Sequence, residues 1–199
     1  MPRLSFNTES TTNIILVTAI ILIISSLFMP LVFVYFIQDY LYLSVDKWFY
    51  DTPPSAYILF MIGMLWISVT LFLYLFLNWK FDWKGVKWIS FLLMLGCIPF
   101  FMFGVSNYYY LDNKGMHFNE HTTFNTINSY YWEDMKEAKE IFVKNNGVTV
   151  VDHLNLVTKS GDVIELPYNS KVRNNRYKIM EKLQENNITL TNNMGDLYE

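Results

Sequence analysis

Three long stretches without a single charged residue lie in the first half of this chain, at 14–37, 57–77 and 88–105. They contain 24, 21 and 18 residues, respectively. A helix needs about 20 apolar residues to cross the hydrocarbon core of a bilayer. Only helices and closed barrels satisfy their backbone hydrogen bonds in that core. The sequence therefore predicts three transmembrane helices at these positions.

Charged residues are distributed unevenly along the 199 residues. Residues 1–106 carry five basic and five acidic side chains, whereas residues 107–199 carry ten basic and thirteen acidic ones. This difference predicts a membrane region at 1–106 and a water-soluble domain at 107–199. The net charge of −3 gives no general basic face and argues against a nucleic-acid partner.

Aromatic residues flank the three stretches, as is typical of side chains at the level of the lipid headgroups. We expect four tryptophans to act as such interface anchors: Trp48, Trp79, Trp83 and Trp88. Pro30 lies inside the first stretch and predicts a kink there, which membrane helices tolerate. No ionisable residue lies inside any stretch, which argues against a pump or transporter, because their pathways use intramembrane charge.

Lysine and arginine residues near the ends of the stretches indicate how the chain crosses the membrane. On the side of the N-terminus there would be four of them: Arg3, Lys80, Lys84 and Lys87. On the side of the C-terminal domain there would be two, Lys47 and Lys114. Cytoplasmic loops carry the excess of basic residues. The sequence therefore predicts a multi-pass protein of the cell membrane with its soluble domain outside.

Short strand-like segments and turn signals alternate in the first part of the soluble domain. A turn sequence at 112–115 separates two short arms, and residues 122–132 are rich in the β-branched and aromatic side chains typical of strands. Residues 133–144 fit a short helix by their apolar spacing, and a strand from Ala138 onwards is the alternative. This part predicts sheet structure with one ambiguous segment.

A β-hairpin and a helix follow. One face of the first hairpin strand is formed by four apolar residues: Val148, Val150, Leu154 and Leu156. A Ser-Gly-Asp turn at 160–162 returns the chain along 163–167. Residues 170–185 have an amphipathic pattern with Ser170 as the expected N-cap, and 188–190 predict a short strand. We expect an α+β domain in which an antiparallel sheet is closed by this C-terminal helix.

The order of these motifs resembles the small pleckstrin-homology-like domains that many bacterial membrane proteins carry after two or three spans. The resemblance rests on 108–112 with its Lys-Gly turn, on the Tyr-Tyr-Trp-Glu-Asp-Met segment at 130–135, and on 161–166 before the closing helix. It implies a barrel-like sheet capped by a helix and a role in binding or assembly, without catalytic residues. It also implies a cytoplasmic domain, opposite to the side that the basic residues indicate, so both sides stay open.

The predicted C-terminal helix carries five basic residues within twelve positions: Lys171, Arg173, Arg176, Lys178 and Lys182. Such a patch can contact anionic lipid headgroups or an acidic protein partner. The alternative is a solvated helix face whose charges are partly paired with Glu181 and Glu185.

A match to a zinc-protease pattern occurs near the start of the soluble domain. His117, Glu120 and His121 fit H-x-x-E-H, in which two histidines bind zinc and the glutamate acts as the base. That chemistry needs both histidines on one helix face, but a glycine turn precedes this segment and two threonines follow it. The context favours loop histidines, and we expect no metal, no cofactor and no enzyme activity.

These patterns best fit a membrane-anchored binding or accessory protein, because three uncharged stretches precede a small domain without a catalytic motif. Besides the membrane, its partner would be another protein or a second copy of the chain. Two alternatives stay open. One is a subunit of a transport or peptide-immunity membrane complex, and the other is a zinc hydrolase at the H-x-x-E-H pattern.

Overall fold

Two compact units make up the protein, whose structure is a computed structural model that describes residues 8–42, 46–81, 85–119 and 126–197. The first unit contains Met1–Leu43, Thr52–Tyr108 and Asn119–Thr126. The second unit contains Ser44–Asp51, Tyr109–Phe118 and Ile127–Glu199. A short segment between the first two predicted spans therefore belongs to the C-terminal unit, which a division of the chain at residue 106 does not anticipate.

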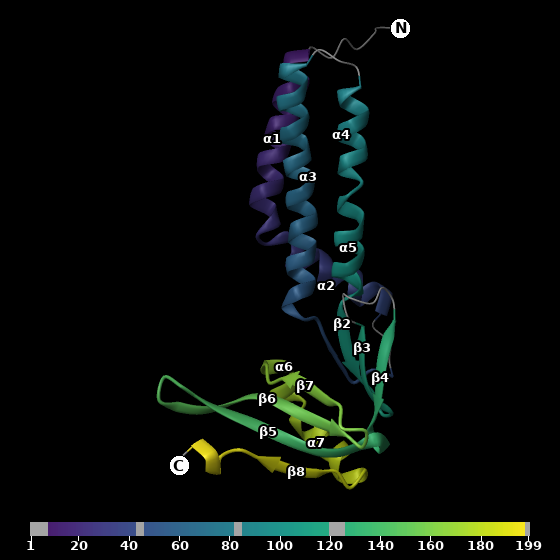
Figure 1. The fold of residues 1–199 in the computed structure, drawn as a ribbon, viewed down its shortest axis with the longest axis vertical. Helices are drawn as coiled ribbons and strands as arrows, with labels where there is room; N and C mark the ends of the chain where they lie inside the picture. The colour runs from purple at the N-terminus through teal and green to yellow at the C-terminus, as the bar shows by residue number, and fades with distance from the viewer. Residues whose placement is uncertain (1–7, 43–45, 82–84, 120–125, 198–199) are drawn as a thin grey trace. The chain divides into compact units, whose positions relative to one another are not determined.

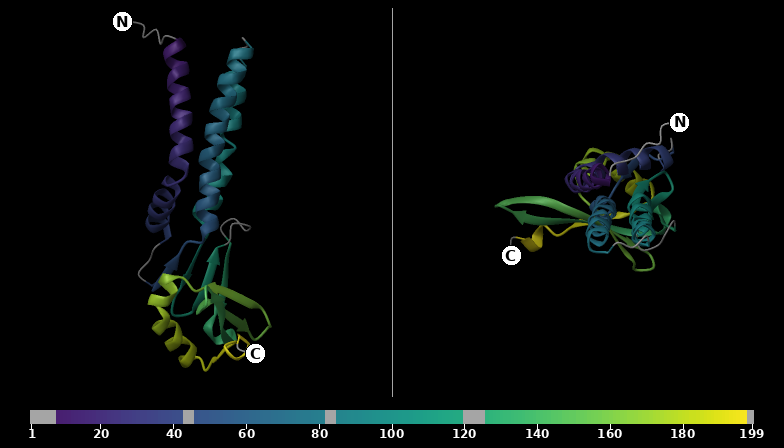
Figure 2. Two further views of the ribbon diagram at one scale, coloured as in Figure 1. Left: turned by 90° about the vertical axis from the view of Figure 1, so that its left-hand side faces the viewer. Right: turned by 90° about the horizontal axis from the view of Figure 1, so that it is seen from above.

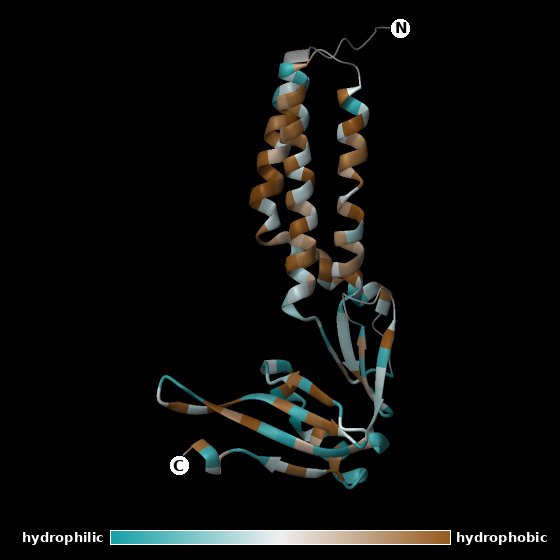
Figure 3. Ribbon diagram, viewed as in Figure 1, coloured by the Kyte–Doolittle hydropathy of each residue, from teal (hydrophilic) through white to brown (hydrophobic). Residues whose placement is uncertain are grey.

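Helices form the first unit (Figure 1). In chain order they are α1 (Thr8–Ser26), α2 (Met29–Tyr42), α3 (Pro54–Lys80), α4 (Val86–Met94) and α5 (Cys97–Ser106). α3 and the combined α4–α5 segment are each long and apolar enough to cross a membrane, and α1 with α2 would make a third span if this bent pair is counted as one. Figure 3 shows the predominantly hydrophobic residues of these helices.

The first predicted span is broken. α1 and α2 are bent by 73° at the two residues that separate them, and Figure 2 shows α2 turned sideways from the end of α1. Pro30 lies in the first turn of α2. There its missing N–H removes no helical hydrogen bond, because the first four N–H groups of a helix have no partner within it. The chain therefore bends beside Pro30 as predicted, but just before the proline.

A buried glutamine connects α2 to the end of α5. Gln38 is 1% exposed, and its Nε2 donates to the carbonyl oxygens of Val105 at 2.9 Å and Asn107 at 3.1 Å. Its Oε1 accepts a hydrogen bond from Thr52 Oγ1 at 2.6 Å. The last carbonyl groups of a helix have no partner within it. Gln38 therefore caps α5, a role that its sequence position did not reveal.

Small residues set the packing of α3 against its neighbours. Ser68 Oγ donates to the carbonyl oxygen of Ala19 in α1 at 2.8 Å. A Cβ atom on Gly104 of α5 would lie 3.0 Å from the carbonyl oxygen of Ala56 in α3. Such small residues let helix backbones approach closely in membranes.

Two four-stranded sheets and two helices form the second unit. The first sheet has the order β1-β2-β3-β4, with β1 (Phe49–Asp51), β2 (Tyr108–Leu111), β3 (Gly115–Asn119) and β4 (Ile127–Tyr131). The second has the order β7-β6-β5-β8, with β5 (Met135–Asn145), β6 (Val148–Thr158), β7 (Val163–Pro167) and β8 (Thr189–Asn192). Between β7 and β8 the chain forms α6 (Ser170–Asn174) and α7 (Arg176–Glu185), and two 3₁₀ turns lie at η1 (Trp132–Asp134) and η2 (Gly195–Leu197).

The predicted antiparallel sheet closed by a helix is only partly correct. The β6–β7 hairpin is antiparallel as expected, but β8 pairs with β5 in parallel, so the second sheet is mixed. A parallel pair needs a crossover connection, and α6 and α7 lie within it. Among the described strands neither sheet closes on itself, and the family resemblance stays a prediction.

The ambiguous segment 133–144 forms most of strand β5, which starts at Met135. Met135 and Ala138 are both buried, and their three-residue spacing suggested a helix. A bulge between Met135 and Glu137 shifts the pairing with β6 by one residue. Because a bulge inserts a residue into the two-residue repeat of a strand, it imitates helical spacing in the sequence.

One hydrophobic core joins both sheets with α6 and α7. Trp132, Leu111 and Leu156 are at most 2% exposed within it. Phe49 of β1 is 3% exposed and belongs to the same core. β1 pairs antiparallel with β2, with Phe49 opposite Leu111. The loop between the first two predicted spans thus supplies a strand and a core residue to the second unit.

Candidate functional site

The predicted basic helix is two helices. α6 ends at Asn174 and α7 begins at Arg176, with Asn175 between them. The N-cap is Asn169, whose Oδ1 accepts a hydrogen bond from the backbone N–H of Val172 at 3.0 Å, so the prediction of Ser170 is wrong by one residue. Asparagine and serine are both favourable N-cap residues, so the sequence alone does not distinguish Asn169 from Ser170 as the start of α6.

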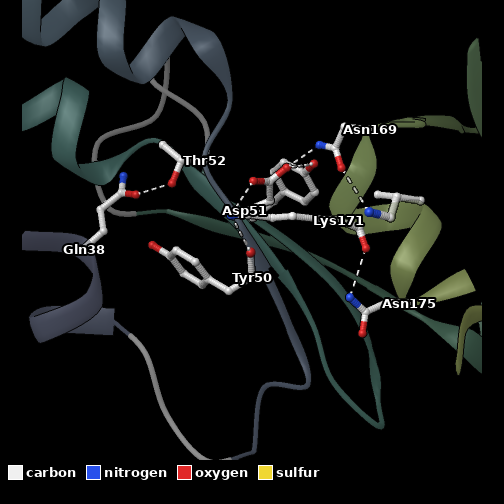
Figure 4. Close-up of polar contacts among 9 residues, drawn as sticks. Gln38, Tyr50, Asp51, Thr52, Asn169, Lys171 and Asn175 are labelled. Carbon is white, nitrogen blue, oxygen red and sulfur yellow. Dashed lines mark hydrogen bonds and ion pairs between the residues drawn. The ribbon is translucent and has the colours of Figure 1, made fainter. Parts of the chain in front are cut away.

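Lys171 belongs to a buried cluster around Asp51 (Figure 4). Its Nζ lies 2.9 Å from Oδ1 of Asp51. The other carboxylate oxygen, Oδ2, accepts hydrogen bonds from the Tyr109 hydroxyl at 2.8 Å and from Asn169 Nδ2 at 2.6 Å. Asp51 is 8% exposed. A buried carboxylate is stable only when paired and hydrogen-bonded, and these three donors meet that requirement.

The same cluster keeps Tyr109 protonated. Burial, and then the negative charge of Asp51, raise the pKa of the Tyr109 hydroxyl well above its ordinary value. The phenol therefore remains a hydrogen-bond donor. The cluster joins β1, β2 and the start of α6, and its role is to hold these elements together.

Arg176 has a similar structural role on β5. Its Nε and Nη2 donate to Oε1 of Glu140 at 3.1 Å and 2.8 Å. Glu140 is 6% exposed, so its charge needs this partner. The hydrogen bonds to Glu140 raise the pKa of Arg176, and the guanidinium stays charged.

The remaining basic residues of the patch lie in different settings. Lys182 Nζ lies 2.7 Å from Oε2 of Glu185, as the helix pattern predicted. Lys178 Nζ lies over the Trp48 ring, 5.7 Å from its centroid. Arg173 is exposed, and its guanidinium forms no hydrogen bond or ion pair with any residue that the structure describes. Most of the predicted positive charge is therefore engaged within the protein, which weakens the case for a lipid-binding face.

A cavity of about 440 Å³ lies beside α7. Its lining includes Asp46, Trp48, Asn113, Lys178, Glu181 and Lys182. Two lysines and two carboxylates balance each other in this lining, so the cavity does not select an anionic ligand.

The predicted interface tryptophans differ in their settings. Trp79 is 82% exposed at the end of α3, and Trp88 is 77% exposed near the start of α4. Trp48 instead packs against the core of the second unit, and its role as an interface anchor stays a prediction. It lies next to Phe49, whose place in β1 draws this segment into the soluble unit. Trp83 lies outside the described residues.

His117 of the H-x-x-E-H pattern lies on strand β3, which is not the helix that a zinc site of this type needs. Its Nδ1 is 2.8 Å from Ser129 Oγ, and its ring stacks on Tyr110 with centroids 4.6 Å apart. Its Nε2 lies 3.2 Å from Oδ1 of Asp112 but without the alignment of a hydrogen bond. Glu120 and His121 lie outside the described residues, and the residues that are described contain no group of three metal ligands.

Asp112 is better explained as the anchor of the β2–β3 turn. Its Oδ1 accepts hydrogen bonds from the backbone N–H groups of Lys114 at 2.8 Å and Gly115 at 2.9 Å. Burial raises the pKa of this carboxyl, but these bonds and the contact with His117 outweigh burial and lower it. The turn predicted at 112–115 is confirmed, and the Ser129–His117–Asp112 arrangement supports it.

An exposed β-ribbon is the most distinctive surface of the second unit. β5 and β6 extend past β7 (Figure 1), and β7 pairs with β6 only from His153 to Val157. Residues 148–151, here called the β6 edge, have no strand of the described sheet on their outer side. Val148 is 62% exposed and Val150 is 40% exposed. The tip is a two-residue turn, Asn146–Gly147, with positive φ at both residues, as the tightest hairpins require.

The opposite edge of the ribbon is covered. Asn193 bonds both backbone groups of Phe142, with its Oδ1 accepting at 2.7 Å and its Nδ2 donating at 3.1 Å. Lys144 Nζ donates to the carbonyl oxygen of Leu197 at 2.6 Å. The C-terminal segment thus continues the cover that β8 begins on β5. No strand of the described sheet pairs with the β6 edge on its outer side.

The sequence predicts that Val148, Val150, Leu154 and Leu156 lie on one face of β6. Leu154 and Leu156 are at most 1% exposed and lie opposite Glu140 and Ala138 of β5. The prediction is wrong for Val148 and Val150, which lie opposite Asn145 and Val143. A bulge at Asp152 shifts the pairing there and moves both valines to the other face of the sheet. Comparisons with protein-family models, curated proteins and solved structures found no match to this chain.

Proposed function

We propose that this protein is a membrane-anchored, non-enzymatic binding protein whose soluble unit docks an extended segment of a protein partner at the β6 edge. The observation that carries the proposal is the aliphatic β6 edge, with which no strand of the described sheet pairs on its outer side. Exposed edges usually carry lysine, proline or another device against pairing with foreign strands. Residues 148–151 read Val-Thr-Val-Val and carry neither lysine nor proline.

An open edge of this kind fits recognition by strand addition. In that mode an extended peptide forms main-chain hydrogen bonds with the edge, and apolar side chains add specificity. Val148 and Val150 would supply the apolar contacts. The internal pairing of Lys171, Arg176 and Lys182 makes a protein partner a better proposal than lipid headgroups for this unit.

The alternative of a subunit in a transport or peptide-immunity complex uses the same surface. A partner that is itself a membrane transport protein, or one that binds a secreted peptide, would identify that role. A second copy of the chain, paired edge to edge, would make the protein a homo-oligomer.

A photo-crosslinking amino acid at position 148 tests the proposal in intact cells. We expect one discrete adduct, because the edge is occupied by a defined segment. Position 163 is a matched control, since Val163 is 61% exposed against 62% for Val148 and lies on β7. Adding Val150→Lys to the position-148 variant should remove the adduct, because a lysine on the edge blocks strand pairing.

Three results would contradict the proposal: no adduct at 148, the same adducts at 148 and 163, or an adduct that Val150→Lys leaves unchanged. An adduct between two copies of the 23.6 kDa chain would identify the homo-oligomer instead.

The side of the membrane on which this unit lies is a separate prediction. The distribution of basic residues predicts that this unit lies outside. A Ser160→Cys variant that also carries Cys97→Ala should therefore be labelled in intact cells by a membrane-impermeant thiol reagent. Residue 160 lies in the exposed β6–β7 turn. Labelling only after lysis would place the unit in the cytoplasm, as the family resemblance implied.

A further inference from the structure

We infer that the helical unit binds one acidic phospholipid in a cavity between α1, α3 and α4. The cavity has a volume of about 250 Å³. Its lining includes Ile15, Leu71, Tyr74, Lys87, Ser90 and Phe91. The inference rests on the proposed membrane placement of the helices, but not on the partner at the β6 edge.

A hydroxyl without a partner faces this cavity. Ser90 is 8% exposed, and its Oγ is buried without a hydrogen-bond partner in the described structure. Three other buried hydroxyls of these helices each donate to a backbone carbonyl: Ser26 to Ile23, Ser68 to Ala19 and Thr70 to Ile67. An unpaired polar group in the apolar part of a bilayer is costly. Ser90 therefore offers a donor to an acceptor group within the cavity.

A lysine lies one helical turn before this hydroxyl. Lys87 is in the first turn of α4, and Ser90 follows three residues later, on the same face and about 4.5 Å further along the helix axis. Lys87 is exposed and forms no ion pair with any residue that the structure describes. The N-terminal end of a helix is also positively polarised, and the N-cap Gly85 has no side chain to satisfy it. The cavity thus has a cationic end.

The cationic end lies at the expected depth of lipid headgroups. The exposed Trp79 and Trp88 lie at the ends of α3 and α4 next to it, and tryptophans mark the membrane–water interface. Beyond Ser90 the lining is mainly apolar, with Leu71, Phe91 and Met94. Thr70 also lies in the lining, but its hydroxyl already donates to the carbonyl oxygen of Ile67. The order along the cavity is therefore cation, hydroxyl and hydrocarbon.

A phospholipid presents complementary groups in the same order. Its phosphate would contact Lys87, an ester carbonyl would accept the hydrogen bond of Ser90, and an acyl chain would cover Leu71 and Phe91. A net negative headgroup fits best, because a zwitterionic headgroup brings its own cation close to Lys87. Free phosphate would leave the apolar part of the cavity unfilled. If the domain lies outside, this end faces the cytoplasmic leaflet, where anionic lipids are enriched.

Native mass spectrometry of the full chain in mild detergent tests the inference, with phosphatidylglycerol and phosphatidylcholine as probes. We expect one phosphatidylglycerol to bind in preference to phosphatidylcholine. Lys87→Gln should weaken binding about fivefold, the effect of one lysine near an anionic surface. Ser90→Ala should weaken it about threefold, through loss of one hydrogen bond. Lys80→Gln is the matched control, since Lys80 lies at the same end and outside the described lining.

Several results would overturn the inference. Equal binding of the two lipids by the unaltered protein would show general lipid contact only, and this comparison needs no variant to fold. Equal losses in Lys80→Gln and Lys87→Gln would show an unlocalised charge effect. Displacement of the lipid by inorganic phosphate would show an anion site without an acyl-chain contribution. None of these results affects the crosslink at position 148, so the failure of one proposal is distinguishable from failure of the other.

Discussion

Replacing Asp51 with alanine should lower the unfolding temperature of the second unit by roughly 10 to 20 °C, because the hydrogen bonds that its carboxylate accepts together contribute about 2–3 kcal/mol. Tyr109 and Asn169 would each lose an acceptor at hydrogen-bond distance. Lys171 would lose its counterion, but its side chain is 53% exposed and can turn to water, and Asn169 is exposed as well. Most of the loss therefore comes from the buried Tyr109 hydroxyl, which is left without an acceptor.

The measurement is thermal unfolding of the full chain in mild detergent, followed by proteolytic cleavage within residues 107–199. Asp196→Ala is the control, because Asp196 is an exposed carboxylate on η2. Lys171→Ala should cost only about 1 kcal/mol, since Asp51 keeps its other two donors. Asp51→Ala and Asp196→Ala variants that unfold at the same temperature would show that the cluster contributes nothing.

The elements that the sequence predicted well are those whose signals are local. Uncharged stretches place helices at 57–77 and 88–105, and the turns at 112–115 and 160–162 lie where the chain reverses. These features depend on residues within a few positions of one another. Pro30 is a local signal for the bend in the first stretch. The proline does not show that the helix breaks just before it, between Ser26 and Met29.

The features that the sequence did not reveal depend on distant pairing. Asp51 bonds Tyr109 across 58 positions and Asn169 across 118 positions. The sequence predicts that Trp48 lies at the lipid headgroups, because a short strand and a membrane interface favour the same aromatic residues. Only the pairing of Phe49 with Leu111 distinguishes the two readings.

The candidate surfaces show the same limit. The sequence shows the cluster of five basic residues in α6 and α7. It does not show that Lys171 pairs with Asp51 and Arg176 with Glu140, because these carboxylates lie on β1 and β5. The backbone of the β6 edge lacks a neighbouring strand because β7 pairs only with residues 153–157. The sequence of β6 alone cannot show how long β7 is. A single serine in an apolar run does not by itself indicate a binding site. Ser90 becomes a candidate only because its buried hydroxyl has no hydrogen-bond partner in the described structure.

Residues 107–199 expressed alone should fail to fold, because they lack β1. Phe49 is 3% exposed in the core and covers Leu111, and complete burial of such a side chain contributes about 1.5–3 kcal/mol. Loss of the hydrogen bonds to Asp51 adds about 2–3 kcal/mol. Together these losses approach the stability of an ordinary domain, about 5–15 kcal/mol. Nuclear magnetic resonance spectra of this segment should show the narrow amide dispersion of an unfolded chain.

A chain that restores β1 should fold without the helices α1 to α5. Asp51 lies opposite Tyr109 in the antiparallel β1–β2 pair, so an Asn-Gly turn can replace residues 52–108 and join 46–51 directly to 109–199. Its amide spectrum should be dispersed, and Asp51→Ala in the same short chain should abolish the dispersion. A well-folded 107–199 segment would show that β1 is dispensable. If the joined chain were unfolded while the full chain resists proteolysis, the second unit would need the helical unit to fold, and the division of the chain into two independent units would be wrong.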